Sequence, residues 1–344
     1  MTELHTRVFQ PNEVAAAARV LREGGLLAIP TETVYGLGAD GLNGEAVARI
    51  FAAKGRPQDN PLILHIPDAG ALPRYCTDIP AAAYALARRF WPGPLTMILP
   101  RRPLVPDAVT AGLDTVGMRC PDHPVTRAIL AEAGVPVAAP SANTSGRPSP
   151  TTAAHVLEDM DGKIEGIVDG GPCAVGVEST IVDLTVQPPR LLRPGGVTLE
   201  ELREVLGQVE VDPAVTRLMG AGEQPRAPGM KYRHYAPKAP VTVIRGVPDQ
   251  AARYIRRHLA DGDGVICFNE FVPLFEGHPV EPIGPAGDPA EQARRVFDAL
   301  RYFDGTDAPR IWAMCPDPTG IGLAVSNRLN KAAGFHIVSL EAEV

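Results

Sequence analysis

Cationic side chains stand on both sides of a glycine in the segment AAKGRPQDNPLILH, residues 52–65. Lys54 and Arg56 follow a stretch whose apolar residues have helical spacing, and a fully apolar run begins a few residues later. One interpretation is a helix that ends at Gly55 and continues as a solvated loop. The other is a site that holds an anion, most simply a phosphate. The residue types in this segment leave both interpretations open.

Other polar side chains stand where short apolar runs begin or end, which is where α/β sheets bind ligands. Taken singly, each has an ordinary structural interpretation, such as a core histidine for His65 or a surface ion pair for Arg119. Taken together, the arginines and the lysine favour an anionic ligand at least as strongly. The residues in question are Thr31, Glu32, Thr33, Tyr35, Lys54, Arg56, Asn60, His65, Arg119, Ser141, Asn143, Ser179 and Arg193.

Better-known motifs are matched poorly. GLGADG at residues 36–41 fits G-x-G-x-x-G, but TETVY separates it from the preceding strand, so loop glycines are the better interpretation. GPCAVGVEST at residues 171–180 resembles a P-loop, yet Val177 stands where a lysine is required. Neither a G-x-S-x-G nucleophile motif nor a clustered set of His and Asp for a metal is present.

The composition is that of a globular protein. The chain has 344 residues, of which 45% are hydrophobic and 21% charged, a length that suggests roughly two domains. The net charge of -7 disfavours strong nucleic-acid binding except through a local patch. The five cysteines form no C-x-x-C pair, which favours a reducing compartment. With no secretory signal or membrane-length apolar run, a cytoplasmic protein without a membrane contact is expected.

Amphipathic stretches and short apolar runs predict the elements that position these residues. Asn12 is expected to cap a first helix that stops at Gly24 and Gly25. Further helices are expected over residues 44–55, 80–90, 123–133 and 152–160. Strands are expected at residues 26–30, 61–66, 95–100, 115–119, 135–140, 165–170 and 179–184. This mixture predicts one α/β domain over residues 1–207 with a mixed sheet.

The rest of the chain changes character twice. Residues 208–240 are rich in Gly and Pro without apolar periodicity, as in a linker. From residue 241 strand-like runs alternate with expected helices at 248–260, 289–303 and 322–333. This alternation predicts a small Rossmann-like, doubly wound α/β domain over residues 241–344.

A series of motifs resembles one family in both content and order. PTETVYGLGAD, KGRPQDNPLILH, WPGPLTMIL, GLDTVGMRCPDHP, PVAAPSANTSGRPSPT and GVESTIVDL are similar to the YrdC-like family, whose domain is a twisted mixed α/β sheet with a concave, positively charged face. LLRPG and APGMKYRHYAP resemble its long, two-domain (Sua-type) form, the threonylcarbamoyl-AMP synthases. The resemblance covers essentially the whole chain, although only GIGLAVSNRLNKAA is distinctive in the C-terminal part.

The resemblance implies a nucleotidyltransferase. Such an enzyme makes threonylcarbamoyl-AMP and pyrophosphate from L-threonine, bicarbonate or CO2, and ATP, for N6-threonylcarbamoyladenosine at position 37 of tRNA. Mg2+ is expected to come with ATP, held mainly by phosphates and water. The partners implied are the downstream threonylcarbamoyl-transferase machinery and a weak contact with tRNA or double-stranded RNA.

The same resemblance implies residue roles wherever a family motif is matched. Lys54 and Arg56 are expected to be catalytic and to stabilise charge at the α-phosphate. Arg147 is an additional cation to which the resemblance gives no role. The threonine site is expected to comprise Thr33, Tyr35, His65, Arg119, the backbone of Ala139, and Ser179. The ATP site is expected to comprise Lys54, Arg56, Asn60, Thr115, Ser141, Asn143, Ser149 and Arg193, with His234 and Tyr235 of the linker folded over the entrance.

Two alternative functions are weighed against this one. A carbamoyl-adenylate enzyme of hydrogenase maturation has the same fold, but it carries acylphosphatase-like and zinc-finger segments before this domain, and no C-x-x-C occurs here. A double-stranded RNA-binding module without catalysis is compatible with a basic concave face. A pure binding module would need neither a threonine-shaped pocket nor a lid, so the synthase is favoured.

Overall fold

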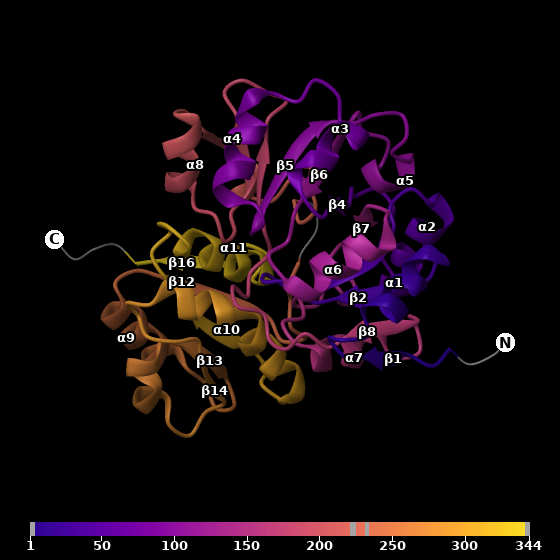
Figure 1. Cartoon of the computed structure of the whole chain (residues 1–344). Coiled ribbons are helices and arrows are strands. Elements are labelled where there is room, and N and C mark those ends of the chain that lie inside the picture. The colour runs from indigo at the N-terminus through magenta and orange to yellow at the C-terminus, as the bar shows by residue number, and fades with distance from the viewer. Residues whose placement is uncertain (1–3, 221–224, 231–233, 341–344) are drawn as a thin grey trace.

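The computed structural model describes residues 4–220, 225–230 and 234–340, and its strands form two sheets (Figure 1). The larger sheet has the strand order β1-β8-β2-β3-β7-β4-β6-β5-β9-β10-β11 within these residues. It is mixed, since β4 and β6 run parallel whereas β5 and β6 run antiparallel. The predicted mixed α/β sheet is confirmed. Its strands are β1 (Arg7–Phe9), β2 (Leu27–Ile29), β3 (Gly36–Asp40), β4 (Ile63–His65), β5 (Leu95–Pro100), β6 (Thr115–Arg119), β7 (Val137–Ala138), β8 (Gly166–Val168), β9 (Thr180–Asp183), β10 (Arg190–Arg193) and β11 (Glu210–Val211).

Helices cover both faces of this sheet. Leu27 and Ile29 of β2 share a core cluster with α1 and α6, whereas Ala28 between them belongs to a cluster with α2. This division follows from the alternation of side chains along a strand. The helices are α1 (Val14–Arg22), α2 (Gly44–Lys54), α3 (Leu72–Tyr75), α4 (Ala81–Phe90), α5 (Asp107–Thr110), α6 (Pro124–Ala133), α7 (Ala153–Met160) and α8 (Leu199–Leu206), with short 3-10 turns η1 (Ala69–Ala71) and η2 (Pro213–Val215).

Helix α2 begins and ends at signals in its sequence. The side chain of Asn43 accepts hydrogen bonds from the backbone amides of Glu45 and Ala46 at the N-terminus. Gly55 ends the helix in the left-handed conformation at φ 61°, which glycine adopts without strain. The expected cap of α1 is wrong, because Glu13 rather than Asn12 occupies that position and makes no side-chain cap bond.

The interpretation of GLGADG as a loop is also wrong. Residues 36–40 form β3, which pairs antiparallel with β2 and with β7. A side chain at Gly38 would lie 2.8 Å from Cγ1 of Val137 and 3.1 Å from the carbonyl oxygen of Leu27. The glycines therefore permit close packing inside the sheet, a role that glycine-rich composition does not distinguish from a turn.

The segment around residue 207 is more structured than its composition predicts. Thr198 and Glu201 form a capping box that starts α8, a signal that the sequence itself contains. Residues 210 and 211 lie inside the predicted linker, yet they form β11 parallel to β10 at the edge of the large sheet. The domain boundaries given above remain predictions. We call the residues that carry the large sheet the N-terminal domain.

The smaller sheet is all-parallel in the order β14-β13-β15-β12-β16, as the strand and helix alternation predicts. We call residues 241–340 the C-terminal domain. Figure 1 shows α10 and α11 between this sheet and the N-terminal domain. The elements are β12 (Val241–Arg245), α9 (Pro248–His258), β13 (Gly264–Cys267), η3 (Asn269–Phe275), β14 (Val280–Pro282), α10 (Pro289–Tyr302), η4 (Phe303–Gly305), β15 (Ile311–Met314), α11 (Gly322–Ala332) and β16 (Ile337–Ser339).

Within the described residues, none of the helices is both long and apolar enough to cross a membrane.

The close packing at Gly38 can be tested by substitution. We expect Gly38→Ala to destabilise the protein by about 1–3 kcal/mol, because the added methyl group would overlap Val137 and strand β2. The matched control is Gly44→Ala, since an added methyl at Gly44 meets nothing within 4 Å. Gly44→Ala should leave stability unchanged or raise it slightly. Urea unfolding of both variants measures the difference, and equal stabilities would contradict the packing role of Gly38.

Candidate active site

A cavity of about 70 Å³ lies where several strands of the large sheet end, and we call it the central cavity. Its wall includes the C-terminal end of α2, the loop after β7, the residues before β9, the end of β10, and Pro228, Gly229, His234 and Tyr235. Segments from distant parts of the sequence therefore meet around one small space. Of the residues predicted above, it is lined by Thr31, Lys54, Arg56, His65, Arg119, Ala139, Ser141, Asn143, Ser179, Arg193, His234 and Tyr235.

The remaining predicted residues lie outside this lining, and the roles given to both groups stay predictions. The hydroxyl of Tyr35 donates to the carbonyl oxygen of Gly171 at 2.7 Å, and the hydroxyl of Ser149 donates to Glu178 at 2.6 Å. Each of these hydroxyls thus has a protein partner behind the wall. Those outside the lining are Glu32, Thr33, Tyr35, Asn60, Thr115 and Ser149. Residues 231–233 of the motif KYRHY lie outside the described residues.

The register of neighbouring strands brings His65 and Arg119 together. These residues stand opposite each other at the ends of the parallel strands β4 and β6. The guanidinium of Arg119 donates to Oε1 of Glu32 at 2.8 Å, and both side chains are buried. Nε of Arg119 has no hydrogen-bond partner among the described residues. Glu32 thus orients Arg119 and leaves part of its donor set available.

His65 is buried and uncharged. Its Nδ1 lies 3.3 Å from the carbonyl oxygens of Ile63 and Val137. Burial, and secondarily the charge of Arg119, lowers the pKa of His65 to about 3. The imidazole is therefore neutral over the physiological pH range, and it can form hydrogen bonds in the cavity without adding positive charge.

Lys54 occupies the last position of α2 and points at the loop after β7. Its ammonium group donates to the backbone carbonyl oxygens of Ser141 and Asn143, and the residue is only 2% exposed. Burial, followed by the nearby charge of Arg56, holds its pKa well below the usual lysine value. The left-handed turn at Gly55 then places Arg56 in the same wall. The segment with Lys54 and Arg56 on both sides of Gly55 is thus both a helix end and part of a cationic wall.

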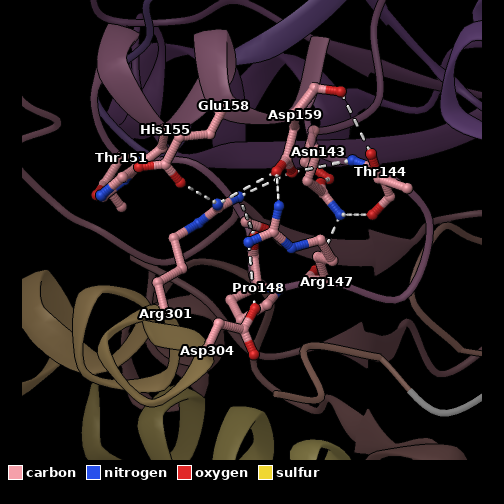
Figure 2. Close-up of polar contacts among 12 residues, drawn as sticks. Asn143, Thr144, Arg147, Pro148, Thr151, His155, Glu158, Asp159, Arg301 and Asp304 are labelled. Atoms are coloured by element: carbon pink, nitrogen blue, oxygen red, sulfur yellow. Dashed lines mark hydrogen bonds and ion pairs between the residues drawn. The ribbon is translucent and has the colours of Figure 1, made fainter. Parts of the chain in front are cut away.

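The loop after β7 is held from its other side by Asp159 of α7 (Figure 2). The carboxylate of Asp159 accepts from the backbone amide of Thr144 at 3.0 Å and pairs with the guanidinium of Arg147. Arg147 also pairs with Asp304 of the C-terminal domain at 3.1 Å. The cation without an assigned role therefore lines the cavity while its charge bridges the two domains.

Arg301 of α10 joins the same group of side chains, as Figure 2 shows. It donates to Oδ2 of Asp159 at 3.0 Å and to the carbonyl oxygen of Pro148 at 2.7 Å. The side chain of Asp159 is fully buried, so its negative charge must be stabilised by these arginine partners. The C-terminal domain thus contributes directly to the support of the loop at residues 141–148.

The opposite wall is built on Arg193 and Ser179. Arg193 donates to the carbonyl oxygen of Ser179 at 3.0 Å and to its hydroxyl at 3.1 Å. The Ser179 hydroxyl also lies 2.8 Å from the hydroxyl of Thr96 on β5. Glu178 precedes Ser179, lines the cavity and was missed from the sequence, where its position between VGV and ST gave no chemical signal beyond its charge.

Across the described residues, no group of three or more His, Cys, Asp or Glu side chains is arranged to hold a metal ion.

The chain matches two domain families, which together cover most of its length. Residues 19–195 match the family of Sua5, YciO and YrdC, described as telomere recombination, and residues 197–334 match the C-terminal domain of threonylcarbamoyl-AMP synthase. The chain is 48% identical over 339 residues to the threonylcarbamoyl-AMP synthase of Pyrococcus abyssi, covering 95% of this chain and 96% of that relative. It is 46% identical over 329 residues to the threonylcarbamoyl-AMP synthase of Bacillus subtilis, covering 95% and 94%.

Solved structures give the same result for the fold. The structure of Pyrococcus abyssi Sua5 complexed with L-threonine matches with a TM-score of 0.92 and 46% identity, covering 98% of this chain and 100% of that one. A structure of a variant of the same protein matches with a TM-score of 0.93 and 45% identity, covering 98% and 99%. The likeness extends over both domains.

The neutral state of His65 predicts a specific loss of stability in acid. Its folded pKa of about 3 lies below the ordinary value of 6.5, so between these values the unfolded chain binds a proton that the folded chain does not. Stability therefore decreases as pH falls through this window. In His65→Gln, the free energy of unfolding should fall by roughly 1.5 kcal/mol less between about pH 6.5 and about pH 5 than in the parent protein.

Urea unfolding at a series of pH values measures this difference. His258→Gln is the matched control, because His258 lies at the exposed end of α9, away from the central cavity. This control should keep the acid sensitivity of the parent protein. If His65→Gln keeps it as well, His65 is not held neutral by the fold.

Proposed function

The chain belongs to the two-domain threonylcarbamoyl-AMP synthase family, and on this basis we propose that it is an L-threonylcarbamoyladenylate synthase. It joins L-threonine, bicarbonate or CO2, and ATP into threonylcarbamoyl-AMP and pyrophosphate. The product supplies the threonylcarbamoyl group for N6-threonylcarbamoyladenosine at position 37 of tRNA. The observation that carries the proposal is the cationic central cavity, in which buried lysine and arginine side chains surround a space suited to anions.

One part of the cavity suits an amino acid. Arg119 is oriented by Glu32 and keeps its Nε without a described partner, which fits it to bind a carboxylate. Neutral His65 can accept or donate a hydrogen bond nearby, although a pKa of about 3 makes it a poor general base at neutral pH. The hydroxyl of Ser179 and the backbone of Ala139 add polar groups to the lining. The relative solved with L-threonine supports an amino-acid site in this family.

The other part suits the phosphates of ATP. Lys54 and Arg56 line the cavity, and the hydroxyl of Ser141 and the amide group of Asn143 lie in the loop that Lys54 holds. When ATP binds, Lys54 can exchange its carbonyl partners for phosphate oxygens without leaving the wall. Charge that develops at the α-phosphate during transfer is then stabilised by groups already in position. Arg193 is proposed to complete the nucleotide site.

Exclusion of water is the second requirement of this chemistry. Threonine carbamate forms when the amine of threonine attacks CO2 or bicarbonate, and it is unstable in water. The carboxylate oxygen of the carbamate group must therefore attack the α-phosphate before the carbamate breaks down. The segment containing His234 and Tyr235 lines the cavity, and Tyr235 is buried there. We propose that this segment closes the site around the intermediate. No side chain is required as a covalent nucleophile.

The remaining features of the proposal concern the surroundings of the reaction. Mg2+ accompanies ATP and is held by phosphate oxygens and water, because the described residues offer no carboxylate cluster for it. Its role is to neutralise phosphate charge. The enzyme is proposed to act in the cytoplasm, to deliver its product to the downstream threonylcarbamoyl-transferase machinery, and to make at most weak contact with tRNA.

The reaction is tested by pyrophosphate release from ATP. We expect release only when L-threonine and bicarbonate are both present, with L-serine a poor substitute. Binding of duplex RNA without release under any combination would contradict the synthase and favour the RNA-binding module.

The phosphate assignment is tested by Lys54→Ala and Arg56→Ala. Each should reduce pyrophosphate release by at least about a hundredfold, because each removes charge from the site of phosphoryl transfer. Arg19→Ala, which removes an exposed cation from α1, is the control and should release pyrophosphate at the parental rate. Parental turnover in Lys54→Ala and Arg56→Ala would refute the assignment.

A further inference from the structure

Helix α11 of the C-terminal domain is buried on nearly every side. Val325 and Leu329 pack in the core of that domain, as expected for an amphipathic helix. The other side carries Asn327, Arg328 and Lys331, which are buried as well. Charged side chains are rarely buried unless they are paired, so the partners of these residues indicate what this side of the helix does.

Those partners lie in the wall of the central cavity. Nε of Arg328 donates to Oε2 of Glu178 at 2.7 Å, and its NH1 group donates to the carbonyl oxygen of Pro194 at 2.8 Å. Arg328 is completely buried, so this ion pair is shielded from water. Pro194 directly follows Arg193, and Glu178 directly precedes Ser179. The side chain of Arg328 thus contacts the two chain segments that contribute Ser179 and Arg193 to the cavity wall.

Glu178 connects Arg328, which lies behind the wall, to the cavity. It lines the cavity, and its second carboxylate oxygen accepts from the hydroxyl of Ser149 at 2.6 Å. Burial alone would raise the pKa of Glu178, but the charges of Arg328 and then Arg193 lower it to about 2. The carboxylate is therefore ionised in a cavity whose other charged groups are mostly cationic.

The same helix also holds the segment that leads to the C-terminal domain. Lys331 donates to the carbonyl oxygen of Gly229, and Asn327 donates to the carbonyl oxygen of Val215 at 2.8 Å. The guanidinium carbon of Arg328 lies 5.7 Å from the ring centre of Tyr235. Gly229 and Tyr235 both line the cavity. These contacts place α11 behind two separate parts of the wall.

We propose that the C-terminal domain completes the nucleotide site through Arg328, a positioning residue that holds the Glu178 carboxylate against the cavity wall. With Arg328 in place, both oxygens of Glu178 are occupied and its charge is balanced. Without Arg328, the carboxylate loses its ion-pair partner and keeps only the attraction of Arg193, so its poorly balanced charge in the lining repels the triphosphate. This inference rests on the proposed function, because it takes ATP as the anion that the cavity binds.

The change expected in Arg328→Gln is a loss of ATP affinity rather than of chemistry. Repulsion by Glu178 acts on bound ATP and on the transition state alike, so it raises KM for ATP and leaves kcat nearly unchanged. We expect KM for ATP to rise at least about tenfold, the size typical of a like charge at a binding site. Steady-state pyrophosphate release at varied ATP concentration, using the full chain, measures both constants.

Rescue distinguishes this role from simple docking of the domains. Adding Glu178→Gln to Arg328→Gln removes the unbalanced carboxylate, so KM for ATP should fall again by most of the increase. The matched control is Arg301→Gln, which breaks the contact of α10 with Asp159 and leaves Glu178 and Arg328 paired. Adding Glu178→Gln to Arg301→Gln should not improve ATP binding.

The KM values of the single and double variants test the role of Arg328. Rescue specific to Arg328→Gln supports the inference, whereas an unchanged KM, or losses that simply multiply in both double variants, overturns it. If Arg328→Gln does not fold, Arg328→Lys is used, because lysine keeps the charge but cannot span Glu178 and Pro194 together. A smaller rise in KM that Glu178→Gln abolishes supports the inference in that case, and a parental KM overturns it.

Direct ATP binding separates this inference from the proposed function. Calorimetric titration of the parent protein with ATP and Mg2+ must give binding, and pyrophosphate release must require threonine and bicarbonate. If the parent protein does neither, the proposed function fails. If it does both while Arg328→Gln binds ATP with parental affinity, only the role of Arg328 fails.

Discussion

Lys54, Arg119, Arg193 and Arg328 are all buried around one small cavity, and a buried cation is stable only when oxygens surround it. Each finds a different kind of partner. Lys54 is held by backbone carbonyls, Arg119 and Arg328 by carboxylates, and Arg193 by the backbone and hydroxyl of one serine. Because partners of this kind fix the position of each charge, the cavity is prepared for an anion before any anion arrives.

The mixed sheet explains how such distant residues meet. In a parallel pair the ends of both strands lie at the same edge, so β4 and β6 bring His65 and Arg119 side by side. Strand β5 runs antiparallel to β6 and therefore begins beside the end of β6, so the chain enters β5 at that same edge. A purely parallel sheet would need long crossovers to place so many chain segments there.

The C-terminal domain is a structural part of this site rather than an appendage to it. Arg301 supports the loop at residues 141–148 through Asp159, and Arg328 supports the opposite wall through Glu178 (Figure 2 shows the first of these). Since removal of one partner leaves a buried charge uncompensated, the two domains are coupled through electrostatics as well as through packing. The charged residues that line the cavity between these walls are mostly cations, although the whole chain has a net charge of -7.

The sequence by itself determined the broad organisation of this protein. Alternating apolar runs predicted the mixed sheet and the parallel sheet, and helix α2 followed from its apolar spacing and from Gly55. The motifs in order predicted the family and many of the residues that line the cavity. These features depend on local spacing, which a sequence displays directly.

Only the tertiary structure decided what pairs with what. Gly38 lies in a strand rather than a turn, and glycine is needed there because Val137 packs closely against it. That contact exists only in the assembled sheet. The bridge that Arg147 forms between the domains could not be predicted, because Asp304, one of its two carboxylate partners, is 157 positions away. Glu178 and Arg328 are separated by 150 positions, and neither is distinctive alone. Pairing between buried charges that are far apart in the chain produces no periodic pattern in the sequence. The contribution of the C-terminal domain to the site could therefore be recognised only in the tertiary structure.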